Sequence, residues 1–277
     1  MTTLLSADRA TGAGAGGSLR RIRAISRRNA YVLLRSPHRF FDLTIWPLVD
    51  VMLFGSLAVF GSQSSGGLQR AAYLLSGVVL WHVVYQANIA VATGFLEETW
   101  TRNLLSLMVT PMREWEYVAG VALFGLVKTA LGVGAVAVTA VALYAFDVTS
   151  LGLGLIPVVV LLMLAGWALA LFVIGLVLRF GTGAEALAWG MLFVLMPLSG
   201  VFYPVSSLPG FLQPIALVLP TTHAFDAAHR LAVGGSVPWG TLGLAAGTTV
   251  LFGAVAVAFL LRMLRTFRSR GFITRYT

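Results

Sequence analysis

The stretch LGLGLIPVVVLLMLAGWALALFVIGLVL, residues 151–178, decides the fold class. It carries no charged residue, and a helix needs about 20 apolar residues to cross the hydrocarbon core of a bilayer. Backbone polar groups in hydrocarbon must be satisfied internally, so only helices and closed barrels span membranes. Because the apolar positions do not alternate with period two, the stretch predicts a membrane-spanning helix and not a barrel strand.

Further apolar runs of similar length follow the same pattern. The six predicted spans lie at approximately 40–60, 73–96, 117–146, 151–178, 184–201 and 242–261. The whole chain of 277 residues is 58% hydrophobic and 10% charged, whereas soluble domains carry roughly 25% charged residues. We therefore expect an all-α membrane protein with six transmembrane helices.

The basic residues predict the orientation of these spans. With a cytoplasmic N-terminus, 16 of the 19 Lys and Arg residues fall on the cytoplasmic side, Arg70 and Arg230 fall outside, and Lys128 lies within a span. The positive-inside rule then places both termini in the cytoplasm. Membrane orientation accounts for the net charge of +9, so nucleic acid is not an expected partner. Arg is far more frequent than Lys, which suggests a GC-rich bacterial genome and hence the bacterial plasma membrane.

Two regions precede the first span. Residues 1–17 have no apolar core of the signal-peptide kind and predict a disordered N-terminal tail. Residues 18–36, SLRRIRAISRRNAYVLLRS, place Arg on several sides of an apolar stripe, as in a helix that lies on the membrane surface. We expect residues 18–277 to form one membrane domain. The absence of cysteine excludes disulfides and thiolate metal sites.

The segment LSGVFYPVSSLPGFLQPIALVLPTTHAF, residues 198–225, is apolar but cannot form one long helix. Pro204, Pro209, Pro214 and Pro220 recur every five or six residues, and proline in a helix interior costs about 3 kcal/mol. Short re-entrant helices over residues 202–232, at the outer end of span five, are one expectation. A packed extracellular loop with a hydrophobic face is the alternative.

Motifs in this segment resemble those of a known family. They are Ser199, Gly200, Phe202, Pro204, Leu208, Pro209, Pro220, His223 and Arg230, with Thr110, Pro111 and Glu116 in a second motif. Their order and spacing are similar to those of the permease subunits of type 2 ATP-binding-cassette exporters. The resemblance covers nearly the whole chain, including the surface helix, the six spans and the outer segment.

The resemblance implies a dimer of permeases, each resting on a separate ATPase subunit that binds ATP and Mg²⁺. Lys128 is preceded by Val127 within a span, so it does not belong to a phosphate-binding loop. We therefore expect no ATP site and no enzymatic activity in this chain. The resemblance also assigns an outer gate. Its residues are Ser199, Gly200, Phe202, Pro204, Leu208, Pro209, Pro220 and His223.

The loop at residues 97–116, EETWTRNLLSLMVTPMREWE, is the predicted ATPase-coupling element. A short helix with apolar side chains could fit a groove in a partner, and the resemblance implies that role. The assigned residues are Glu97, Glu98, Arg102, Leu104, Leu105, Leu107, Thr110, Pro111, Arg113 and Glu116. The alternative is an amphipathic loop that lies on lipid headgroups.

Two charged residues fall inside predicted spans. Asp50 and Lys128 each lie about 15–17 Å from the cytoplasmic end of their span, at 1.5 Å per residue. Ionisable side chains at such depth are usually paired or functional. We expect a pair that fixes how spans one and three pack; a proton relay is the alternative.

Four polar residues at and after the end of the proline-rich segment are candidates for a metal site: His223, Asp226, His229 and Arg230. Helical spacing turns His229 about 120° away from His223, which argues against metal binding. Asp226 and Arg230, at spacing i, i+4, predict an ordinary ion pair. We expect these side chains to form a solvated face.

The sequence thus predicts the membrane subunit of an exporter for an amphipathic or lipid-linked substrate, such as a drug-like compound, a glycolipid or a polysaccharide. Aromatic candidates for the substrate path are Trp46, Phe54, Trp81, Tyr85 and Tyr203, although packing and lipid anchoring explain each of them as well. Two rival functions are an ion-gradient transporter and a membrane assembly factor without transport activity.

Overall fold

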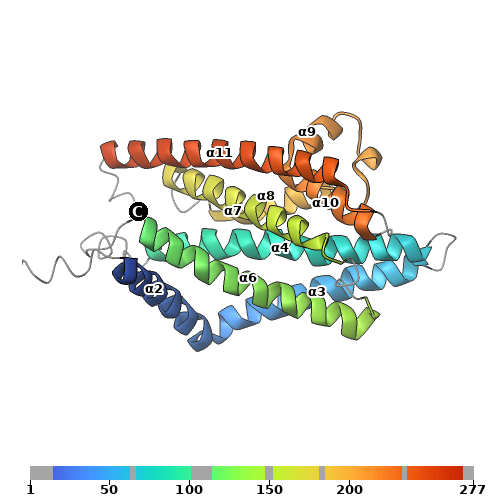
Figure 1. Cartoon of the computed structure of the whole chain (residues 1–277), viewed down its shortest axis with the longest axis horizontal. Coiled ribbons are helices and arrows are strands. Elements are labelled where there is room, and N and C mark those ends of the chain that lie inside the picture. The colour runs from blue at the N-terminus through green and yellow to red at the C-terminus, as the bar shows by residue number, and fades with distance from the viewer. Residues whose placement is uncertain are drawn as a thin grey trace, which may run out of the picture.

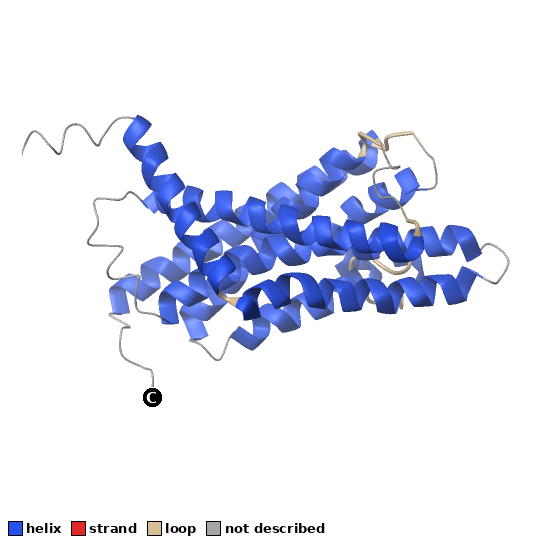
Figure 2. Ribbon diagram, turned by 90° about the horizontal axis from the view of Figure 1, so that it is seen from below, coloured by secondary structure: helices blue, strands red, loops and turns tan. Residues whose placement is uncertain are grey.

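The computed structural model describes residues 15–62, 67–100, 114–146, 152–180, 185–232 and 236–270. All regular structure within these ranges is helical, and most of the long helices lie side by side along one direction (Figures 1 and 2). The predicted all-α class is confirmed.

Within these described ranges, eight longer helices and two short ones follow in chain order. They are α2 (Ala15–Arg35), α3 (Pro37–Ser62), α4 (Gly67–Trp100), α6 (Glu114–Tyr144), α7 (Leu155–Phe180), α8 (Glu185–Leu198), η3 (Val205–Ser207), α9 (Gln213–Val218), α10 (Pro220–Ala232) and α11 (Trp239–Arg270). Here η3 is a single 3₁₀ turn.

Four of the described helices are long and apolar enough to cross a membrane. Their apolar stretches are Ala71–Phe95, Ala119–Tyr144, Leu155–Phe180 and Trp239–Thr266, which match predicted spans two, three, four and six. The first predicted span lies on α3, where the described apolar stretch is the shorter Ile45–Gly61. The fifth lies on α8, whose 14 residues extend about 21 Å. Spans one and five therefore stay predictions.

Several predicted boundaries are wrong by a few residues. The N-terminal tail was extended too far, because α2 already begins at Ala15. The coupling loop was also too wide, since α4 continues to Trp100 and α6 begins at Glu114. Acidic residues favour the first turn of a helix through its macrodipole, and Glu114 and Glu116 occupy that position.

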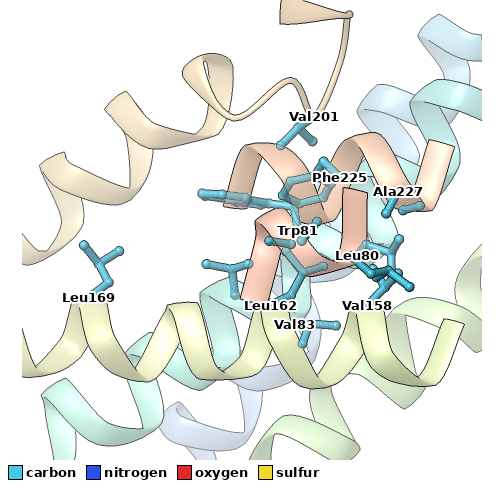
Figure 3. Packing of buried hydrophobic residues seen from close by; sticks show 14 of the residues in the cluster. Leu80, Trp81, Val83, Val158, Leu162, Leu169, Val201, Phe225 and Ala227 are labelled. Carbon is cyan, nitrogen blue, oxygen red and sulfur yellow. The ribbon is translucent and has the colours of Figure 1, made fainter. Parts of the chain in front are cut away.

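Helix α4 forms the centre of the bundle. It packs against α3, α6, α7 and α10. Of the most apolar part of α4, 83% is buried, whereas the corresponding part of α11 is 17% buried. Trp81 and Leu80 of α4 meet Leu162 of α7, Phe225 of α10 and Val201 in the main hydrophobic core (Figure 3).

Both described ends of the chain lie at one end of the bundle, while α9 and α10 lie at the opposite end (Figure 1). We call these the α2 end and the α10 end. Helix α2 runs at a steep angle to the other helices (Figure 2). This arrangement agrees with termini on one side of a membrane, and the side itself stays a prediction.

Candidate functional site

The prolines of the segment 198–225 start its short helical pieces. Pro204 immediately precedes η3 with φ −63°, Pro214 lies in the first turn of α9, and Pro220 is the first residue of α10. The fixed φ of proline suits the first turn of a helix, where its missing N–H has no helical partner anyway. The predicted division into short helices is confirmed; whether they enter the membrane stays a prediction.

Side chains at the start of α10 hold the end of α9. The Thr222 hydroxyl donates to the Ala216 carbonyl at 2.6 Å, and His223 Nε2 donates to the Leu217 carbonyl at 2.9 Å. The last carbonyls of a helix have no partner within the helix. The sequence Pro-Thr-Thr-His therefore supplies both the start of α10 and the polar partners for α9.

Ser199 and Gly200 close α8. The Ser199 hydroxyl donates to the Leu195 carbonyl at 2.7 Å and lies 2.6 Å from the Thr221 hydroxyl. Gly200 has φ +74°, a left-handed conformation that favours glycine over other residues. These contacts connect the end of α8 to the first turn of α10.

The chain then crosses the surface of α4. The Tyr73 hydroxyl donates to the Gly200 carbonyl at 3.2 Å. A Cβ at Gly77 would collide with the Val201 carbonyl oxygen, so the backbone can pass this close only over glycine. Phe202 next stacks on Phe54 of α3, with ring centroids 4.5 Å apart.

The structure therefore brings the predicted outer-gate residues together at the α10 end. Leu208 is buried, and its carbonyl accepts a 2.9 Å hydrogen bond from Gln213 Nε2. The assigned set, Ser199, Gly200, Phe202, Pro204, Leu208, Pro209, Pro220 and His223, spans the region from the end of α8 to the first turn of α10. Its role as a gate stays a prediction.

The predicted solvated face of α10 is wrong for His229. That side chain is only 5% exposed and stacks on Tyr73 with ring centroids 3.4 Å apart. Neither ring nitrogen makes a hydrogen bond. Asp226 and Arg230 form the expected exposed ion pair at 3.0 Å. Because α10 packs against α4, α7 and α11, only one side of this helix can remain solvated.

Burial makes His229 sensitive to acid. Loss of hydration lowers the pKa of His229 to about 3, and a backbone group of Tyr73 only partly opposes this. Below the usual histidine pKa of about 6.5, the unfolded chain binds a proton that the folded chain cannot bind. Folding stability is therefore lost as pH falls from about 6.5 towards 3.

We expect His229 to cost about 2 kcal/mol of stability when pH falls from about 7.5 to 5. The isosteric variant His229→Asn should lose less stability over the same interval. Thermal melting of both purified proteins in detergent at the two pH values measures the difference. Equal acid sensitivity of the two proteins would show that His229 does not titrate on unfolding.

At the opposite end, an ion pair ties α2 to α6. Arg21 Nε and a terminal guanidinium nitrogen both donate to the Glu116 carboxylate at 2.8 Å. Glu116 is fully buried, and its hydrogen bond raises the pKa of Arg21. The Ser26 hydroxyl also donates to the Gly120 carbonyl at 2.8 Å. We call these contacts the α2–α6 clamp.

Most of the predicted coupling residues lie outside the described residues. These are Arg102, Leu104, Leu105, Leu107, Thr110, Pro111 and Arg113. Glu97 and Glu98 belong to the last turn of α4. Glu116 is among the described residues, and its carboxylate accepts two hydrogen bonds from Arg21. Sequence reasoning missed this partner because the two residues are 95 positions apart.

Asp50 lies beside a histidine that sequence reasoning did not use. Asp50 Oδ2 is 3.5 Å from His82 Nε2 on α4. The register of α3 on α6 is set by the Tyr144 hydroxyl, which donates to the Met52 carbonyl at 2.8 Å. Lys128 lies 16 residues before Tyr144, about 24 Å along α6. The contact of Asp50 with Lys128 stays a prediction, and His82 could have been noticed as a polar residue in an apolar span.

The aromatic residues predicted to line a substrate path lie in different environments. Trp46 is 59% exposed on α3, whereas Trp81 is 3% exposed. Trp81 lies in the main core (Figure 3). Phe54, Tyr85 and Tyr203 are partly buried. Trp81 is thus a core residue in this conformation, and the path itself stays a prediction.

Comparison with known proteins bears on the whole arrangement. The sequence model described as ABC-2 type transporter matches residues 20–231. No curated protein matches the chain. The matched region begins in α2 and ends in α10, so it includes the α2–α6 clamp, Asp50 with His82, and the proline-rich segment. The chain therefore belongs to the ABC-2 type transporter family and is a membrane permease of that family.

Proposed function

We propose that this permease is the membrane-spanning subunit of an ATP-driven exporter. It moves an amphipathic or lipid-linked substrate out of the cytoplasm or the inner leaflet. Family membership supports the permease role and, in general, an ATPase partner. In the proposed assembly two copies of the chain associate with two ATPase subunits, which bind ATP and Mg²⁺.

The observation that carries the proposal is the α2–α6 clamp. Glu116 lies three residues after the stretch 101–113, which connects α4 to α6. A partner that moves this stretch therefore acts on the last turn of α4 and the first turn of α6 at once. The clamp extends that movement to α2, because Arg21 holds Glu116 through two hydrogen bonds.

Helix α4 can carry the movement to the α10 end. Its 34 residues extend about 51 Å. Tyr73 and Gly77, near its start, contact Gly200 and Val201. A displacement of α4 along its axis would therefore shift the segment that follows α8, which is the proposed outer gate.

The basic residues support an orientation with the α2 end in the cytoplasm of a bacterial cell. Arg20, Arg23, Arg27 and Arg28 lie on α2, and Arg265 lies near the end of α11. Arginine at this end suits the positive-inside rule. The gate then faces the outside, as export requires.

The first test is co-purification of the chain with the ATPase encoded beside its gene. We expect a stable complex with ATPase activity. The variant Leu104→Ser, Leu105→Ser, Leu107→Ser should bind the ATPase at least about tenfold more weakly, since a combined loss of about 1.4 kcal/mol suffices for a tenfold change. A matched control changes Phe211, Ile215 and Val218, which are exposed at the α10 end, to Ser.

The outcomes separate the two parts of the proposal. Failure of any neighbouring ATPase to bind the wild-type chain would overturn the exporter assignment. If the leucine variant and the control bind the ATPase equally well, the exporter assignment stands, but residues 104–107 are excluded as the docking element.

A further inference from the structure

Asp50 places a carboxylate on an apolar surface. The exposed face of α3 includes Trp46, Val49 and Leu53, which are 59%, 44% and 55% exposed. Among them, 41% of the Asp50 side-chain surface is exposed. A carboxylate at membrane depth is costly in contact with lipid and normally faces protein or a water-filled cavity. This part of α3 is therefore suited to line a path and not to face lipid.

The hydrogen bonds of His82 fix its tautomer. His82 Nδ1 lies 2.9 Å from the Val78 carbonyl oxygen, and a carbonyl oxygen can only accept. Nδ1 therefore carries a proton, and in the neutral imidazole Nε2 is an acceptor. That Nε2 faces Asp50 Oδ2 at 3.5 Å, so two acceptors face each other when the carboxyl group is ionised.

Such a pair needs a donor between its members. One added proton makes the pair neutral, and without it the pair has a charge of −1 and two free acceptor sites. The separation of 3.5 Å exceeds the usual 2.7–3.2 Å of a direct hydrogen bond. Asp50 can be reached by a donor from outside, whereas the His82 side chain is only 2% exposed.

The surroundings favour an organic cation as that donor. Trp46 lies one helical turn before Asp50 on the same exposed side of α3, and an indole face attracts cations. On α4, Tyr85 lies beside His82, with ring centroids 6.1 Å apart. On α6, the Tyr144 hydroxyl donates to the Met52 carbonyl of α3.

We propose that Asp50 and His82 form a subsite for the protonated amine of an amphipathic substrate. The ammonium group donates a hydrogen bond to the exposed Asp50 carboxylate, which has His82 on its buried side, and the Trp46 indole one turn away attracts the cation. The inference rests on the proposed function in that the exposed face of α3 lines the transport path.

A matched pair of probes tests the subsite. Monodansylcadaverine carries a primary amine, and its N-acetyl derivative is uncharged but otherwise alike. Binding of each is measured by dansyl fluorescence with the full chain in nanodiscs of phosphatidylcholine, with empty nanodiscs as the background. We expect wild-type protein to bind the amine at least about tenfold more tightly than the acetylated probe, as charge-assisted hydrogen bonds allow.

Variants assign the preference to named atoms. Asp50→Asn should remove the preference for the amine and leave binding of the acetylated probe unchanged, which a misfolded protein would not do. His82→Gln should weaken amine binding more than acetylated-probe binding. The control Asp226→Asn removes an exposed carboxylate at the α10 end and should keep the preference.

The proposal is overturned if wild type does not prefer the amine, or if Asp50→Asn retains the preference. These measurements need no ATPase, so they are independent of the co-purification test. A preserved amine preference without any ATPase partner would remove the exporter assignment and leave the subsite standing. If the chain binds an ATPase but shows no preference for the amine, the exporter assignment stands and the subsite is removed.

Discussion

Replacing Arg21 with Glu is expected to lower the melting temperature of the purified permease by roughly 10 °C. The Glu116 carboxylate is fully buried, and Arg21 donates two charge-assisted hydrogen bonds to it at 2.8 Å. The variant removes these donors and adds a second carboxylate beside the first. A buried charge that loses its partner is strongly destabilising, whereas the intact pair contributes less than its geometry suggests.

The charge exchange Arg21→Glu with Glu116→Arg should recover much of the loss, because the two charges still attract. Arg20→Glu alters the neighbouring residue on the exposed side of α2 and should leave the melting temperature nearly unchanged. Thermal unfolding in detergent, followed by tryptophan fluorescence, measures all three. If the Arg21→Glu and Arg20→Glu variants have the same melting temperature, the α2–α6 clamp does not stabilise the fold.

The second large effect is expected at Gly77. A Cβ there would meet the Val201 carbonyl oxygen, which is backbone and cannot rotate away. Gly77→Ala should therefore separate α4 from the chain that follows α8 and cost about 1–3 kcal/mol, the range of overpacked cores. The Tyr73 hydrogen bond to Gly200 should be strained by the same displacement.

Gly247→Ala provides the matched control. Gly247 also lies in a long apolar helix, α11, but a Cβ there meets no atom within 4 Å. Alanine favours helix over glycine by up to about 1 kcal/mol, so this variant should be neutral or slightly stabilised. Chemical unfolding in mixed micelles compares the two. Equal stability of the Gly77 and Gly247 variants would contradict the close approach at α4.

The helices could be predicted because each depends on local composition. Apolar runs such as 151–178 need no distant partner to become helical in a membrane, since helix formation satisfies the backbone within the segment. The prolines likewise predicted short helical pieces, because their effect on φ is local. The boundaries near Ala15 and Glu114 were less accurate because helix ends depend on neighbours and capping.

The partners of polar residues could not be predicted in the same way. Arg21 is 95 positions from Glu116, and nothing in either local sequence indicates the other. Asp50 lies 3.5 Å from His82, a neighbour that depth in the span did not indicate. His229 was expected in solvent because its neighbours Asp226 and Arg230 are polar. The side of α10 that is buried depends on α4, α7 and α11.

The central position of α4 also constrains how the chain is made. Two of its polar side chains contact later parts of the chain: Asn88 Nδ2 lies 3.5 Å from the Gly166 carbonyl of α7, and the Tyr73 hydroxyl donates to the Gly200 carbonyl. During synthesis α4 enters the lipid before these partners exist. Unsatisfied polar groups in hydrocarbon are costly, so a newly inserted α4 must be shielded by α3, by water or by the insertion machinery. The first half of this permease is thus an incomplete intermediate in biosynthesis, and it becomes stable only when the second half arrives.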